Sequence, residues 1–81
     1  MQPKPERFRA MPRYYFNIDG VHPFRDEHGE ELADDVAAWT EALRLGRDLE
    51  GKLRPGQKWQ LYVVVDGTPV FVISVASRRL R

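Results

Sequence analysis

Apolar and polar residues alternate along the first regular part of the chain. Over residues 13–19, Tyr14, Phe16 and Ile18 fall on one side of an extended backbone and the intervening residues fall on the other. This period of two is typical of a half-buried β-strand. Asp19-Gly20 follows and predicts a turn, because glycine accepts backbone conformations that other residues avoid.

A short return strand is predicted at His22–Arg25, with Phe24 as its apolar residue. Pro23 has no backbone N–H, so this strand is expected at an edge of the sheet. Asp26 and Gly29 then occupy the first and fourth positions of a second turn, where these residue types are favoured. The chain therefore opens with a predicted β-hairpin.

The next segment repeats its apolar residues with the period of an α-helix. Asp34 is the expected N-cap, because its carboxylate can accept from the free amides of the first turn. Pro55 and Gly56 end the helix, since a residue before proline avoids the helical conformation. Gly46 is expected where the helix approaches a sheet closely. The predicted apolar face comprises Ala38, Trp39, Ala42, Leu45, Gly46, Leu49 and Leu53.

Two strongly apolar segments, Trp59–Val65 and Val70–Val75, predict a second hairpin around Asp66-Gly67. Two turns fit this spacing: a two-residue turn, or a three-residue loop with a bulge. The sequence leaves both open. Because side chains alternate between the faces of a sheet, a shift of one residue reverses which face of the last strand is buried.

The two turns make opposite predictions for the last strand. The two-residue turn pairs Leu61 with Val72 and leaves Phe71 and Ile73 on the face away from the helix. The bulged loop pairs Leu61 with Ile73 and leaves Val70 and Val72 there. In either case the hairpin has more large apolar side chains than one helix can cover.

The predicted order is strand, strand, helix, strand, strand (ββαββ), in the α+β class. One amphipathic helix covers one face of a four-stranded antiparallel sheet and leaves the other face open. We expect one domain over residues 13–76, a flexible basic arm with three prolines over 1–12, and a basic tail over 77–81. Met11 is an alternative start of the chain. The arm lacks the apolar segment of a secretory signal, so a cytoplasmic location is expected.

The segment Met11–Gly20, MPRYYFNIDG, resembles the opening of a family of small uncharacterised proteins, mainly alphaproteobacterial. These proteins begin M-P-R-Y-[YF]-F-[DN]-[IV]. The resemblance continues through Arg25–Leu32 and a W-x-[LV]-x-V strand at residues 59–63. It departs at Ala33, where proline is common, and in the strongly apolar last hairpin. The resemblance implies the same element order and a domain of unknown function, and it transfers no catalytic residue.

Composition limits the class of protein further. The 81 residues are 42% hydrophobic and 31% charged, which is typical of a soluble globular domain and not of a disordered chain. The absence of cysteine excludes disulfides, thiolate metal sites and cysteine nucleophiles. The apolar runs are far shorter than the roughly 20 residues of a membrane-spanning helix. Because so short a chain builds only a small core, oligomerisation is a plausible source of stability.

The net charge of +1 conceals an uneven distribution, since ten of the twelve acidic residues lie within residues 14–50 and both ends of the chain are basic. In one interpretation, these regions complement each other within one copy or between copies. In the alternative, the domain is a small nucleic-acid-binding regulator. The acidic middle disfavours that alternative, which would use Arg13, Arg78, Arg79 and Arg81 on phosphates and Tyr15 and Tyr62 on bases.

No arrangement of residues indicates catalysis or a cofactor. His22 and His28 lack the helical spacing of a metal-binding pair. Ser74 and Ser77 are not in a nucleophile elbow, and the glycines are too scattered for a phosphate-binding loop. The acidic residues of the turns are interpreted as a solvated surface. We therefore expect a protein that is not an enzyme, with no catalytic, metal-binding or cofactor-binding residue.

The apolar excess of the second hairpin is the most unusual feature of the sequence. Contiguous exposed apolar surface usually marks an interface. We therefore predict a non-enzymatic protein-interaction module, either a homodimer or an inhibitor or regulator that docks on a larger protein. A dimer would pair two open faces or join two edge strands. The expected interaction residues are Tyr15, Tyr62, Val64, Phe71 and Ile73.

Overall fold

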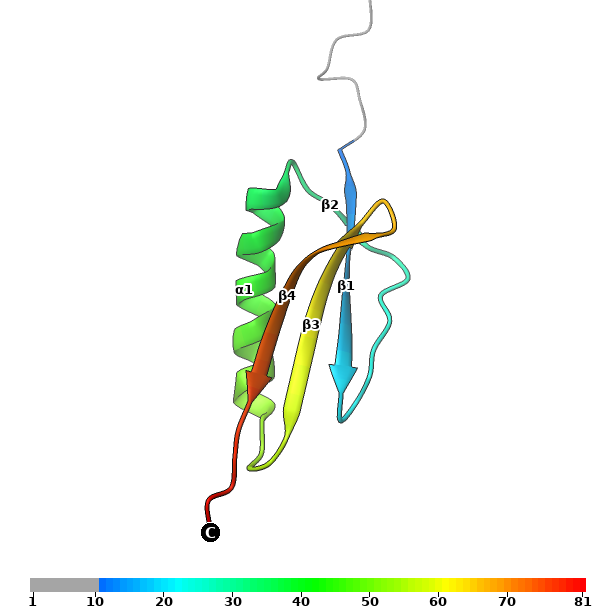
Figure 1. Ribbon diagram of the computed structural model, residues 1–81. Coiled ribbons are helices and arrows are strands. Elements are labelled where there is room, and N and C mark those ends of the chain that lie inside the picture. The colour runs from blue at the N-terminus through cyan, green and yellow to red at the C-terminus, as the bar shows by residue number, and fades with distance from the viewer. Residues whose placement is uncertain (1–10) are drawn as a thin grey trace, which may run out of the picture.

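A computed structural model describes residues 11–81, so residues 1–10 of the predicted arm lie outside the described residues (Figure 1). The chain forms five elements in the order ββαββ, which confirms the α+β class and the predicted order. The elements are β1 (Arg13–Gly20), β2 (Glu30–Glu31), α1 (Asp35–Lys52), β3 (Lys58–Val65) and β4 (Thr68–Ala76).

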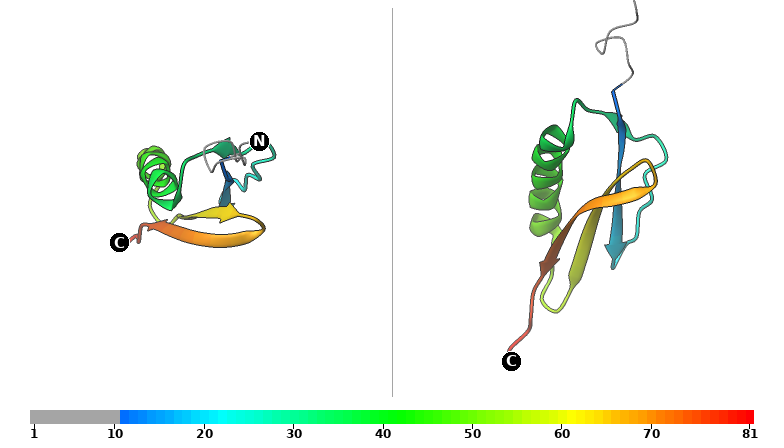
Figure 2. Two further views of the ribbon diagram at one scale, coloured as in Figure 1. Left: turned by 90° about the horizontal axis from the view of Figure 1, so that it is seen from above. Right: turned by 45° about the horizontal axis from the view of Figure 1, so that its top comes forward.

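The sheet has the strand order β2-β1-β3-β4, and every neighbouring pair is antiparallel. The long strands β1 and β3 pair along most of their length, from Tyr14 opposite Val65 to Gly20 opposite Trp59. Helix α1 packs against β3 and β4 on one side of the sheet (Figure 2). Among the described residues, no helix covers the other side, so the sheet has one covered face and one open face.

The second strand differs from its predicted position. At His22–Arg25 only Phe24 pairs with β1, through two backbone hydrogen bonds with Ile18 of 2.8 and 2.9 Å. The strand that completes the sheet is Glu30–Glu31, which lies beside Arg13 and Tyr14. The predicted return strand is therefore wrong in place, and a loop over residues 21–29 separates Gly20 from β2.

Asp26 explains this difference. Its carboxylate accepts from the backbone N–H groups of Phe16, His28 and Gly29 at 3.0–3.2 Å, and its own N–H donates to the Asn17 side chain at 2.9 Å. Side chains thus replace the backbone pairing that a return strand would supply. Burial favours the neutral acid, but the three N–H donors outweigh that effect and lower the pKa of Asp26 below its usual value.

Helix α1 begins as predicted, with Asp34 as N-cap and its side chain accepting from the Ala37 N–H at 3.0 Å. The line of residues that faces the sheet is narrow and mostly small: Ala38, Ala42, Gly46 and Leu49. Trp39 was expected in this line but is 39% exposed, so that prediction is wrong. Trp39 follows Ala38 directly and so points about 100° away from it around the helix axis. Its ring packs against the ring of Phe71, with 5.1 Å between the ring centroids.

The second hairpin combines features of both predicted turns. Asp66 and Gly67 form a two-residue turn with positive φ angles of 52° and 73°. A bulge at Val70 then shifts the register, so Leu61 pairs with Ile73 and not with Val72. Phe71 and Ile73 therefore face the helix.

The core joins the inner face of the sheet to the helix. Its buried residues are Tyr14, Phe16, Ala38, Ala42, Leu49, Trp59, Leu61 and Val63. Within it, the Tyr14 hydroxyl donates to Asp35 Oδ1 at 2.7 Å and so ties β1 to the first turn of α1. This hydrogen bond to a carboxylate, together with burial, raises the pKa of Tyr14 to about 12.

Candidate interaction surface

The open face of the sheet holds a cluster of apolar side chains. Tyr15 lies opposite Val64 on the neighbouring strand, and Tyr62 lies opposite Val72. Tyr15, Tyr62 and Val64 are half-buried, whereas Val72 remains 52% exposed. The structure therefore brings together Tyr15, Tyr62 and Val64 of the predicted interaction residues, and adds Val72.

Phe71 and Ile73 do not belong to this cluster, because the observed register is the one of the two expected registers that places them on the helix side. The bulge at Val70 turns both side chains to the helix side. Phe71 packs against Trp39, and Ile73 lies beneath Gly46, where an added Cβ would be 3.7 Å from Ile73 Cγ2. The sequence offers this register as one of two alternatives but cannot choose it, because a bulge adds a residue without a characteristic residue type at that point.

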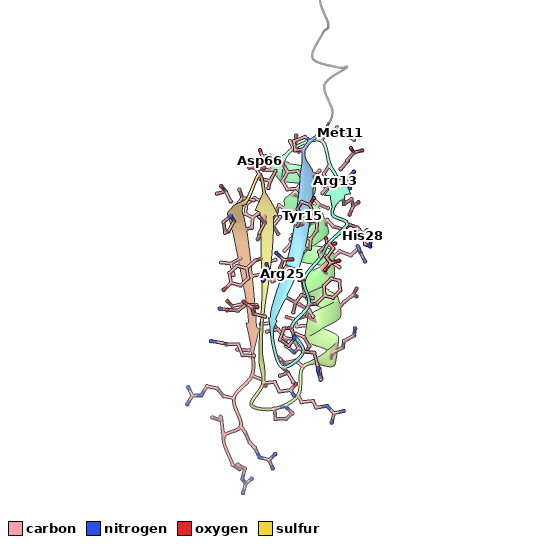
Figure 3. The ribbon with its side chains drawn as sticks, turned by 90° about the vertical axis from the view of Figure 1, so that its right-hand side faces the viewer. Met11, Arg13, Tyr15, Arg25, His28 and Asp66 are labelled. Atoms are coloured by element: carbon pink, nitrogen blue, oxygen red, sulfur yellow. The ribbon has the colours of Figure 1, made fainter. Side chains whose placement is uncertain are left out.

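Polar groups border the apolar cluster of the open face. Arg25 belongs to the loop after β1 and lies on the same side of the molecule as Tyr15 of β1 (Figure 3). The Tyr62 hydroxyl donates to Gln60 Oε1 at 3.0 Å, which leaves its ring to form the surface. A shallow depression there is lined by Asn17, Asp19, Arg25, Tyr62, Val64 and Pro69.

A second apolar surface runs along the flank of α1 that lies beside β4. Val36 is 72% exposed, and Trp39 and Leu43 are each 39% exposed. With Phe71 of β4, the first two line an almost wholly apolar hollow. Sequence reasoning missed this flank. Its signal is the spacing of Val36, Trp39 and Leu43, which repeats with the helical period but lies to one side of the main apolar face.

Strand β4 is the outermost strand of the sheet. Natural edge strands are commonly protected by charged side chains, proline or bulges. Here Pro69 and the bulge at Val70 protect only the start of the strand, and the segment Thr68–Ala76 contains no charged residue. Residues Val72–Ala76 thus form an unprotected edge, which we call the open edge.

The open edge borders a groove of about 440 Å³ against the C-terminal half of α1. Leu43 and Leu53 give the helix side of the groove its apolar part, and Arg47 and Glu50 add one charge of each sign. The strand side is formed by residues 73–76. The groove, the open edge and the flank therefore form one continuous feature along β4.

Comparison with protein families gave one decisive match. The model of a domain of unknown function, DUF6894, matches residues 13–76, which include all five elements. The chain belongs to the DUF6894 family. This confirms the expectation of a domain of unknown function. Comparison with curated proteins and with solved structures gave no match.

The DUF6894 domain does not gather the arginines predicted for nucleic-acid binding. Arg13 lies at the end of the sheet near Asp66 (Figure 3). Its Nη2 is 3.3 Å from Glu31 Oε2, and its Nη1 donates to the His28 carbonyl at 2.8 Å. Arg78, Arg79 and Arg81 follow β4 at the opposite end (Figure 1). These four side chains therefore form no common surface.

The two histidines of the DUF6894 domain make different contacts. The His22 ring lies 6.0 Å from the Trp59 ring, and His28 contributes backbone groups to the loop. Over residues 11–81, no three His, Asp or Glu side chains are grouped so that they could hold a metal ion. No helix in that part of the chain combines the length and apolar character needed to cross a membrane.

Proposed function

We propose that this DUF6894 domain is a non-enzymatic protein-interaction module that self-associates. The observation that carries the proposal is β4, an uncharged outermost strand with Val72 52% exposed at its centre. An unprotected edge of this kind is a template for pairing with another strand. The apolar flank of α1 beside it extends the same surface.

Energetics favour covering this surface. Each Å² of apolar surface removed from water is worth about 25 cal/mol, and a core as small as this one supplies only about 3–5 kcal/mol. Association is therefore a substantial addition to the stability of the fold. Two-fold dimers are the commonest closed assemblies, so a homodimer is the form that we propose.

The same surface would serve an inhibitor or regulator that docks on a larger protein. The resemblance of the segment Met11–Gly20 to mainly alphaproteobacterial proteins supports a bacterial origin of the chain. We further propose that the module acts in the cytoplasm. The competing proposal, a nucleic-acid-binding regulator, has less support, because Arg13 is engaged with Glu31 and lies far from the arginines of the tail.

Sedimentation equilibrium tests the proposed function directly. We expect the wild-type chain to show twice the monomer mass at tens of micromolar. A strictly monomeric chain at that concentration overturns self-association. The same preparation, titrated with polynucleotide at low salt, tests the competing proposal. Binding that collapses at moderate salt would support nucleic-acid recognition, and no binding at low salt would remove it.

A further inference from the structure

We infer that the occupant of the open edge is a second copy of this chain, whose residues Val72–Ala76 pair antiparallel with the same residues around a two-fold axis at Ser74. The two sheets then become one continuous sheet with both helices on one face. This inference rests on the proposed self-association and specifies its surface and register.

The first step concerns which backbone groups are available. At the end of the hairpin the Ser77 N–H donates to the Gln57 carbonyl at 3.0 Å. Because hydrogen-bonded and non-hydrogen-bonded pairs alternate along an antiparallel ladder, Val72, Ser74 and Ala76 direct their N–H and C=O groups away from β3. Three evenly spaced residues on the open edge therefore present a donor and an acceptor each.

The second step concerns the register. Three such residues pair fully with a reversed copy only when the middle one lies on the axis, so Ser74 faces Ser74 and Val72 faces the partner's Ala76. An axis at Val72 would instead place Ser74 opposite the bulged residue Val70. An axis at Ala76 would carry the pairing beyond the end of β4 into the basic tail.

The third step concerns charge on the helix. Gly46 lies directly over Ile73, as the 3.7 Å separation of its added Cβ from Cγ2 shows. A strand rises about 3.3 Å per residue and a helix about 1.5 Å, so Ser74 is level with a point between Arg47 and Glu50. A two-fold axis there reverses the partner helix and sets Arg47 beside the partner's Glu50, twice.

Around the axis, the C-terminal half of α1 is thus complementary in charge to the same part of the partner helix. Strand β4 has no charged residue and brings no like charges together there. The open face of the sheet offers no comparable match. Its apolar cluster is bordered by Arg25 and Asp19, but the face of a sheet presents no row of free backbone N–H and C=O groups that would fix a register. The observations therefore favour the open edge over the open face as the contact between copies.

Engineered cysteines distinguish the two contacts, because the chain has no cysteine of its own. Directly opposed residues of a hydrogen-bonded antiparallel pair have Cα atoms about 5.5 Å apart, within the range of roughly 4.4–6.8 Å that a disulfide spans. Ser74→Cys should therefore cross-link to itself under mild oxidation. Val64→Cys, on the open face, is the matched control.

Both variants are measured beside the wild-type chain in sedimentation and non-reducing electrophoresis. We expect Ser74→Cys to form a reducible covalent dimer about tenfold or more faster than Val64→Cys, since pairing holds its thiols at high effective concentration. A dimeric wild type whose Ser74→Cys variant cross-links no faster than Val64→Cys overturns the register and leaves self-association standing. A monomeric wild type overturns the proposed function itself.

Discussion

At the scale of single residues, Tyr14 makes the one side-chain hydrogen bond between β1 and α1 that the structure shows over residues 11–81. Its ring is buried beneath the helix, and its hydroxyl reaches the carboxylate of Asp35. The sequence predicts the inward direction of Tyr14 from strand alternation. It does not predict the partner, because Asp35 approaches only after the helix has packed on the sheet.

The raised pKa of Tyr14 predicts how stability depends on alkaline pH. An unfolded tyrosine loses its proton near pH 10, whereas the folded one holds it to about 12. The corresponding part of the free energy of unfolding is complete below pH 10 and is lost as the pH rises from 10 through about 12. Thermal unfolding followed between pH 8 and pH 12 should show this decline.

Tyr14→Phe separates this effect from other titrations. The variant should lose about 1–2 kcal/mol at neutral pH, the value of one hydrogen bond to a charged acceptor that is partly exposed. It should also show a shallower decline above pH 10 than the wild type. Equal declines in the two chains would show that the Tyr14 proton does not contribute.

The effect of Gly46→Ala on the free energy of unfolding should be opposite in sign to the one that the place of Gly46 on the apolar face suggests. A glycine on the apolar face indicates a close approach that excludes a methyl group. The structure instead places an added Cβ 3.7 and 3.8 Å from Ile73 carbons, which is ordinary van der Waals contact. Gly46→Ala should therefore raise the free energy of urea unfolding by up to about 1 kcal/mol, the propensity difference. A decrease would show that the approach is tighter.

At the scale of elements, α1 is attached to the sheet by a narrow line of residues. Leu49 is the only large side chain in that line and is 6% exposed. Leu49→Ala should cost about 2–5 kcal/mol, because it removes buried methyl groups and leaves a cavity. Denaturant unfolding measures this loss.

Val36 provides the matched control on the same helix, since it is 72% exposed. Val36→Ala should change the free energy of unfolding by no more than about 0.5 kcal/mol, as is usual for exposed positions. Similar losses from the two substitutions would contradict the packing of α1 through its Leu49 side.

Periodicity predicts the elements that depend on local sequence. The alternation over residues 13–19, the helical repeat after Asp34 and the two apolar segments of the last hairpin all correspond to observed elements. Two features are outside its reach. The loop over residues 21–29 depends on Asp26 contacting β1. For β4 the sequence offers two registers, and the choice of the bulged one is made by tertiary contacts.

At the scale of the whole molecule, the proposed dimer predicts a charge-exchange experiment. Arg47→Glu would set two pairs of like charges face to face across the axis. The dissociation constant should then rise about tenfold at low salt, since exposed pairs contribute up to about 1 kcal/mol each. Sedimentation equilibrium measures it.

The double variant Arg47→Glu with Glu50→Arg is the control, because it restores opposite charges with the positions exchanged. It should return the dissociation constant close to that of the wild type. A double variant as weak as the single one would show that these side chains do not face each other.

The sequence predicts that an interaction surface exists, but not which surface of the folded domain forms it. An excess of apolar residues in the last hairpin indicates an interface, and Tyr15, Tyr62 and Val64 do gather on the open face. The open edge is a property of strand order, which places β4 outermost. The apolar flank with Val36 and Leu43 depends on how the helix is rotated over the sheet, and a sequence pattern alone does not fix that rotation.

The unequal burial of the two tryptophans makes the chain its own fluorescent probe. Trp59 is 6% exposed inside the core, whereas Trp39 is 39% exposed beside β4. A dissolved quencher should reach the indole of Trp39 and be kept from that of Trp59 while the domain is folded. Shielded emission therefore reports the integrity of the core, and quenchable emission reports what happens along the helix flank, without any label.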